Sequence, residues 1–185
     1  WWERDTNSAG VCFRRAVELE PDNAQTRLCY GGALSDNGEF DAARRELQMA
    51  QAIDPDLIPV HSHLALLDWH FQAQTQPPAA LMKLAIQSPD FVLNWHFLGL
   101  AQLCLGNGEE YVAALRQTAV LREEEVLFEE LAQCEKWLAK GGSSMLWREL
   151  AFQAKSGSIG QPHAQLPMAA LCASHGQHRA VLEDI

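Results

Sequence analysis

Residues 24–57 read AQTRLCYGGALSDNGEFDAARRELQMAQAIDPDL, and this stretch decides the predicted fold. Its apolar residues recur at helical spacing on both sides of Gly38, and Pro55 ends the second run. Gly38 lies where the chain must turn, and glycine adopts a positive φ without strain. Small residues such as Gly31 and Ala43 allow two helices to approach closely. The stretch therefore predicts a pair of packed α-helices joined by a short turn.

The pair repeats along the chain. Pro21, Pro55 and Pro89 follow one another at intervals of 34 residues, a period that is typical of stacked helical units. We expect units of this kind over residues 24–57, 58–91 and 92–122. Such units pack only against their neighbours and form a solenoid.

Individual residues refine the expected helices. Pro77 and Pro78 stand where the second helix of unit 58–91 should begin, which predicts a late and shortened helix. In unit 92–122 the turn at residues 106–108 is expected to carry two or three extra residues. In unit 24–57, Arg27 takes a place that the repeat pattern gives to tryptophan.

The ends of the chain follow the pattern less closely. Residues 8–21 match the second helix of a partial repeat, and residues 123–185 predict degenerate helical pairs, with a break at Gly141–Gly142. We therefore expect residues 1–185 to form a single all-α domain, a right-handed solenoid of about five helix pairs, the outer ones degenerate. The chain opens on Trp1 and closes without a helix stop signal, so we expect it to be a piece of a larger protein.

The residues from Ala9 to Ala114, including the Trp95–Leu98–Gly99 signature, resemble the tetratricopeptide repeat family. That resemblance implies a non-catalytic protein- or peptide-binding module. The segments FRRAVELEPDNA, GGSSMLWREL and ALCASHGQHRAVLE are also similar to the C-terminal region of bacterial winged-helix transcription activators, and to regions behind bacterial adenylate cyclase domains. This second resemblance implies the sensory or partner-binding part of a bacterial regulator, active in signalling or transcription regulation.

The family resemblance also implies a binding groove. Its concave face is lined by set positions of the first helices. On this chain those positions give the expected partner-binding residues Leu28, Ser35, Asp36, Ser62, Leu66, Trp69, His70, His96, Leu100 and Leu103. The lysine and asparagine with which related domains clamp a terminal carboxylate are not at these positions, so recognition of an acidic C-terminus is disfavoured. Two interpretations stay open: the groove receives an apolar or helical segment of a partner, or the chain's own C-terminal helices fill it.

Composition and motifs disfavour other functions. The net charge is −10 without a basic run, which argues against nucleic-acid contact. No apolar run reaches the length of roughly 18 residues that a membrane span needs. The five cysteines contain no CxxC pair, and the histidines lack the spacing of a zinc site, so we expect no metal and no cofactor. We find no catalytic motif and do not expect an enzyme.

Two alternative functions are kept. One is a helical domain that senses a small molecule in a closed pocket, and the other is a structural or self-associating solenoid that forms homo-oligomers. The compartment stays undetermined: the cytoplasm is favoured, and the periplasm would apply if a membrane span preceded the segment.

Overall fold

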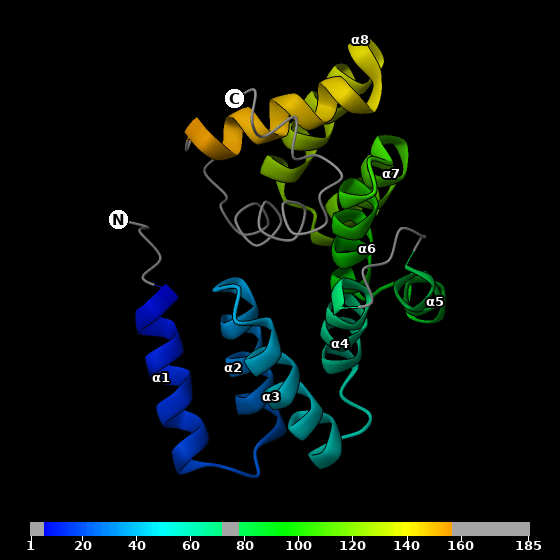
Figure 1. Ribbon diagram of the computed structural model, residues 1–185. Helices are drawn as coiled ribbons and strands as arrows, with labels where there is room; N and C mark the ends of the chain where they lie inside the picture. Colours follow the sequence, from blue (N-terminus) through cyan, green and yellow to red (C-terminus); the bar gives the residue numbers. More distant parts are fainter. Residues whose placement is uncertain (1–5, 72–77, 157–185) are drawn as a thin grey trace. The chain divides into compact units, whose positions relative to one another are not determined.

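Helices account for all regular structure in the part of the chain that is described. A computed structural model describes residues 6–71 and 78–156, and each regular element in these ranges is an α-helix. The chain divides into two compact units between Asp68 and Trp69, and each unit is described by itself. Figure 1 shows helices that follow one another as pairs joined by short turns. The predicted all-α fold of tetratricopeptide-like helix pairs is confirmed.

The first unit contains three complete helices and most of a fourth. Its elements are α1 (Thr6–Leu19), α2 (Ala24–Asp36), α3 (Phe40–Ile53) and the greater part of α4 (Ile58–Phe71). The pair predicted for residues 24–57 is α2 and α3, which lie side by side along their length. Gly38, in the turn between them, has a φ of 78°, the left-handed conformation for which glycine is suited.

The core of the first unit forms where α2, α3 and α4 meet. Ala43, Leu47 and Ala50 of α3 are fully buried, with an exposure of 0%. A Cβ atom added to Gly31 of α2 would lie 2.8 Å from Cγ of Leu47, so only glycine allows this approach of α2 to α3. The other buried core residues of this unit are Ala24, Leu28, Leu34, Val60, Leu64 and Leu67.

A single type of hydrogen bond recurs at the start of the first helix of each unit of 34 residues. A side-chain nitrogen at the fourth position of the unit contacts the carbonyl oxygen of the proline six residues earlier. The bonds are Arg27 Nε to Pro21 O at 2.7 Å, His61 Nε2 to Pro55 O at 2.6 Å and Trp95 Nε1 to Pro89 O at 2.7 Å. Three chemically different side chains therefore tie the helix to the preceding proline in the same way.

Arg27 is thus no departure from the repeat in its hydrogen bonding. Its Nη1 also forms an ion pair with Glu46 of α3 at 2.7 Å. At His61 a carbonyl oxygen can only accept, so Nε2 carries the proton and Nδ1 faces the amide of Gln51 at 3.3 Å.

The second unit holds the remaining helices. They are α5 (Ala79–Gln87), α6 (Val92–Cys104), α7 (Gly108–Arg122) and α8 (Glu125–Ser156). The helix α5 begins directly after Pro78 and has 9 residues, against 14 in α3, which confirms the predicted late and shortened helix. The buried side chain of Asn94 donates to the carbonyl oxygens of Leu84 and Ser88, and so joins the end of α5 to the start of α6.

The turn between α6 and α7 differs from the prediction. Gly106 has a φ of 80° and stands as far from the start of α6 as Gly38 stands from the start of α2. The expected extra residues are therefore absent. Asn107 belongs to a turn of ordinary length, and Gly108 is the first residue of α7. The prediction was wrong because Gly108, although a glycine, is already helical.

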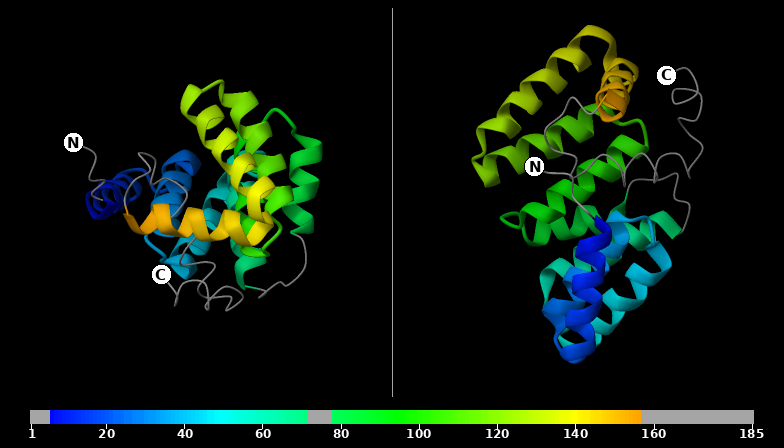
Figure 2. Two further views of the ribbon diagram at one scale, coloured as in Figure 1. Left: turned by 90° about the horizontal axis from the view of Figure 1, so that it is seen from above. Right: turned by 90° about the vertical axis from the view of Figure 1, so that its left-hand side faces the viewer.

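The helix α8 consists of two helical segments. Gly141 and Gly142 have non-helical backbone angles inside it, with φ 66° and ψ −163° at Gly142. This confirms the predicted pair of helices around the two glycines, and Figure 2 shows that the segments run in different directions. The last predicted helical pair falls in residues 157–185, which lie outside the described residues.

Candidate partner-binding surface

In the first unit, most of the predicted groove residues are buried by the chain itself. Leu28 and Ser35 of α2 have exposures of 7% and 8%, and Ser62 and Leu66 of α4 have 0% and 5%. Only Asp36, the last residue of α2, is exposed. The Ser62 hydroxyl donates to the carbonyl oxygen of Ile58 in its own helix. Leu28, Ser35, Ser62 and Leu66 therefore help to hold the fold, and Asp36 can meet a partner directly.

In the second unit, the predicted groove residues fall into two groups. Trp69, Leu100 and Leu103 are buried, whereas His70 and His96 are half-buried. Each of these histidines lies against the phenylalanine that follows it in sequence, with ring centroids 5.5 Å apart for His70 and 5.7 Å for His96. The two imidazoles are the predicted groove residues of this unit that solvent reaches most readily.

The C-terminal half of α6 is covered on all sides. Every residue from Phe97 to Cys104 is buried. A surface helix of a soluble protein normally keeps one polar face in contact with solvent. The face of α6 that the repeat pattern assigns to a groove is therefore closed over these two turns.

Part of this cover comes from the second segment of α8. The buried indole Nε1 of Trp147 donates a hydrogen bond of 2.7 Å to the carbonyl oxygen of Leu103. The Ser143 hydroxyl accepts one of 3.0 Å from the backbone N–H of Gly108, the first residue of α7. Carbonyl groups at the end of one helix and N–H groups at the start of the next lack partners within the helix. The α6–α7 turn gives each of these two groups a backbone partner, since the Gly106 N–H donates to Leu103 and the Gly108 N–H donates to Gly106. Residues of α8 add a second hydrogen bond at each helix end.

The contact between Trp147 and Leu103 concerns one interpretation that the sequence left open, in which the chain's own C-terminal helices fill the groove. At Leu103 the chain's own C-terminal part lies on the predicted groove residue. Trp147 and Ser143 were not among the predicted site residues. The signal for Trp147 was present, since Leu146, Trp147 and Leu150 follow one another at helical spacing, but the sequence does not show which helix such a stripe covers.

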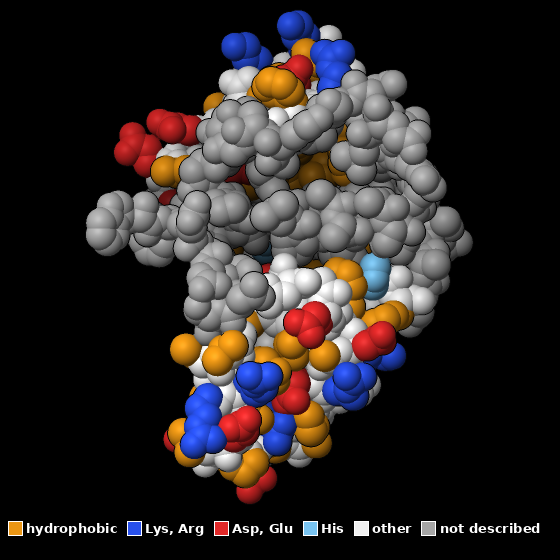
Figure 3. All heavy atoms as spheres, turned by 60° about the vertical axis from the view of Figure 1, so that its left-hand side comes forward, with side chains coloured by type: hydrophobic (Ala, Val, Ile, Leu, Met, Phe, Trp, Pro, Cys, Tyr) orange, Lys and Arg blue, Asp and Glu red, His pale blue; other side chains and the backbone are white. Residues whose placement is uncertain are grey.

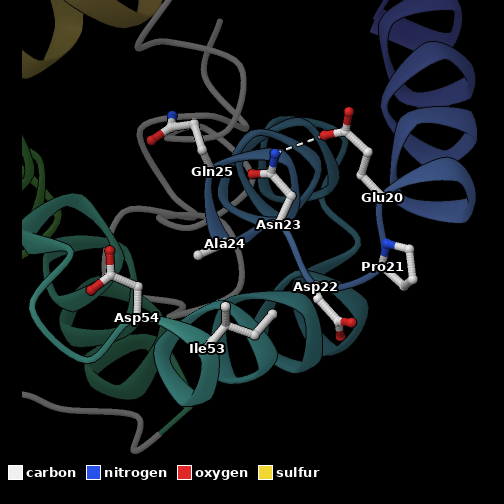
Figure 4. Close-up of a pocket in the computed structure, with 8 residues that line it drawn as sticks. All are labelled: Glu20, Pro21, Asp22, Asn23, Ala24, Gln25, Ile53 and Asp54. Carbon is white, nitrogen blue, oxygen red and sulfur yellow. Dashed lines mark hydrogen bonds between the residues drawn. The ribbon is translucent and has the colours of Figure 1, made fainter.

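A shallow cavity of about 690 Å³ lies in the first unit, where the α1–α2 connection meets the end of α3. Figure 4 shows that the carboxylates of Glu20, Asp22 and Asp54 around it point in different directions. Glu20 accepts a hydrogen bond of 2.7 Å from the Asn23 amide. The carboxylates do not converge on one point, so the geometry does not favour a cation site.

A second shallow cavity, of about 440 Å³, lies between α7 and the first segment of α8. Arg116 of α7 and Glu135 of α8 form an ion pair at its edge. Both groups are half exposed, so solvent screens the pair and its contribution to stability is small. Figure 3 shows apolar, acidic and basic side chains intermingled over the described residues of the face that it presents.

Three titratable side chains gather between α7 and α8. Tyr111 is hydrogen-bonded to Cys134, and its pKa is raised well above the usual value, first by burial and then by the neighbouring Cys134 and Glu130. Burial raises the pKa of the Cys134 thiol to about 12. Burial also raises the pKa of Glu130. All three shifts favour neutral groups, which suits a packed interface better than a reaction centre.

The histidines, cysteines and carboxylates do not form a metal centre within the described ranges, where no group of three or more is placed to hold an ion. Cys104 and Cys134 are buried free thiols, while Cys12 is exposed and Cys29 is half-buried. In the same ranges no helix is both long enough and apolar enough to cross a bilayer.

Comparison with known proteins agrees with the helical pairs of the first unit. Residues 3–67 match a family model described as tetratricopeptide repeat. The match ends one residue before the boundary of that unit. No curated protein matches the chain.

Proposed function

We propose that the chain is a non-catalytic protein-binding module, the partner-binding part of a bacterial regulatory protein. The observation that carries this proposal is the repeated helix pair, matched over residues 3–67 by a tetratricopeptide repeat model. Such repeats generally mediate protein–protein interaction. They do so because stacked pairs create an extended surface that a second chain can follow.

The proposed contacts are the predicted groove residues that solvent reaches. Asp36 serves in the first unit, and His70 and His96 serve in the second. The other predicted groove residues are buried and help to hold the helices that carry these contacts: Leu28, Ser35, Ser62, Leu66, Trp69, Leu100 and Leu103. The contacts that solvent reaches are one carboxylate and two imidazoles, so the proposed partner is a protein segment, helical or extended, that presents hydrogen-bonding side chains to them.

A small-molecule sensor has less support. A ligand of that kind is normally enclosed on most sides by a preformed pocket. Both cavities described above are shallow and open to solvent. A self-associating solenoid would be indicated if the partner isolated in the test below were a second copy of this chain.

The test begins with isolation of a partner on the full chain, followed by calorimetry with the purified partner. His96→Ala should weaken binding by about tenfold, since a groove contact of about 1.4 kcal/mol is lost. Ile86→Ala is the matched control, because Ile86 is an exposed side chain on α5 with 75% exposure. Equal affinities for both variants and the unchanged chain would refute the groove. Trp69→Ala would be ambiguous, because the Trp69 side chain is 5% exposed and its removal leaves a cavity.

A further inference from the structure

We infer that residues 143–156, the second segment of α8, occupy a helix-binding face on α6 and α7, and that an amphipathic helix of a partner displaces them. We call this segment the strap. The inference rests on the proposed protein-binding function and describes how access to that surface is controlled.

The strap is itself amphipathic. Leu146, Trp147 and Leu150 have exposures of 0%, 6% and 7% and lie on one side of the helix. Arg148 and Phe152 are exposed, Phe152 at 57%. Helices that bind in grooves of other proteins present an apolar stripe of this kind. The strap therefore has the form of a bound ligand helix.

Two polar contacts fix the strap at its N-terminal end. Trp147 donates to the carbonyl oxygen of Leu103, and Ser143 accepts from the N–H of Gly108. The approach at Gly108 is close, because a Cβ atom there would lie 2.7 Å from the Ser143 hydroxyl oxygen. The turn itself also gives each group a backbone partner, because the Gly106 N–H donates to the Leu103 carbonyl and the Gly108 N–H donates to the Gly106 carbonyl. The strap adds a second bond to each group, and a partner helix with an indole and a hydroxyl at the same spacing would replace both.

The glycine pair provides a hinge. Gly142 has φ 66° and ψ −163°, a conformation that is essentially restricted to glycine. On the other side of the hinge, the first segment of α8 has its own buried residues, Leu131, Cys134 and Trp137. Rotation at Gly141 and Gly142 therefore releases the strap while the first segment stays packed on α7.

The geometry also defines the partner. It is an amphipathic helix with tryptophan at the position of Trp147 and leucine-like side chains one residue before and three residues after it. The surface that this helix would reach is the α6–α7 turn, where Trp147 now contacts Leu103 and Ser143 contacts Gly108. Binding requires the strap to leave, so the fraction of chains with an open strap limits the apparent affinity.

The test uses a fluorescent peptide with the sequence of residues 143–156, SSMLWRELAFQAKS, added to the full chain. Trp147→Ala in the chain weakens its own strap and should raise the affinity for the peptide by about tenfold or more over the unchanged chain. Phe152→Ala is the control, because Phe152 is exposed on the same helix, and it should leave the affinity unchanged. A peptide in which alanine replaces tryptophan should not bind.

Gly142→Ala provides a second variant that keeps every strap side chain. Alanine is strained at φ 66°, so this change should also open the strap and increase peptide binding. If circular dichroism shows that Trp147→Ala is unfolded, Gly142→Ala decides the question. Peptide affinity that is the same for the unchanged chain and the folded variant overturns the inference.

The outcomes separate the strap from the proposed function. A chain that binds a purified partner through His96, but whose opened variants bind the peptide no better, keeps the protein-binding function and loses the strap. Enhanced peptide binding by the opened variants, without any partner that depends on His96, supports the strap and refutes the groove contacts proposed above.

Discussion

The indole Nε1 of Trp95 donates a hydrogen bond of 2.7 Å to the carbonyl oxygen of Pro89, which precedes α6. The same bond joins His61 to Pro55 before α4. In each case the proline lies two residues before the end of one 34-residue repeat, and the donor lies in the first turn of the next helix. The bond therefore fixes the junction between successive units, and what the position requires is a hydrogen-bond donor of sufficient length.

His61 tests this requirement. His61→Phe keeps an aromatic ring but leaves the Pro55 carbonyl without its donor, and should destabilise the fold by about 0.5–1.5 kcal/mol. His61→Arg should cost less, because Arg27 makes the equivalent bond with its guanidinium. Urea unfolding of the two variants checks the prediction, and equal losses for Phe and Arg would contradict it.

Gly31 and Gly32 form a matched pair on α2. A Cβ atom at Gly31 would lie 2.8 Å from Leu47, while the nearest atom to a Cβ at Gly32 is Cε1 of His63 at 3.7 Å. Gly31→Ala should therefore destabilise by about 1–3 kcal/mol through overpacking. Gly32→Ala meets ordinary contacts and should be neutral or stabilise by up to about 1 kcal/mol, because alanine favours helix. Similar thermal melts for both variants would show that α2 and α3 do not pack in this register.

Glu123 has the left-handed conformation, with φ 53°, at the C-terminal end of α7. This conformation is unfavourable for residues other than glycine by roughly 1–2 kcal/mol, although glycine loses more entropy on folding. Glu123→Gly should therefore stabilise the chain by up to about 1 kcal/mol, measured by urea unfolding. Exposed Glu125→Gly in the first turn of α8 is the control and should destabilise it.

Glu130 should make stability depend on pH. Burial raises the pKa of this carboxyl above its ordinary value of 4.5, so the folded chain holds the proton more tightly than the unfolded chain. The contribution of protonated Glu130 to the free energy of unfolding is fully present below pH 4.5. It is lost as the pH rises through the pKa that Glu130 has in the folded chain. Glu130→Gln should thus raise the melting temperature at pH 7 and have little effect at pH 4. The same benefit at both pH values would exclude titration of Glu130 as the cause, and exposed Glu129→Gln is the control.

The sequence predicts the helix pairs well because the repeat restricts each position separately. Gly38 and Gly106 mark turns, Pro78 delays α5, and the glycine pair at 141–142 breaks α8, all through local backbone preferences. Burial of the predicted groove residues was harder to foresee. Contact between Trp147 and Leu103 joins residues 44 positions apart and depends on where α8 turns at its hinge. Local spacing identifies an apolar stripe but carries no information on which surface it will cover.

At Arg27 the sequence pattern indicates a departure from the repeat, but the structure shows the same hydrogen bond as in the other repeats. An arginine in place of tryptophan looks like a weakened repeat by sequence similarity. Its Nε nevertheless makes the bond to Pro21, and its Nη1 adds the ion pair with Glu46. The three repeats thus share this hydrogen bond although the residue that donates it differs. A comparison of residue types alone does not detect the shared bond.

We propose that this chain binds a protein through the groove side of its helix pairs. The most direct measurement places a photo-cross-linking amino acid at position 96 or at position 86 of the full chain and irradiates each with the purified partner. We expect a cross-linked complex from position 96, half-buried on α6, and little or none from position 86, exposed on α5. Equal cross-linking from both positions, or a complex formed only from position 86, would contradict it.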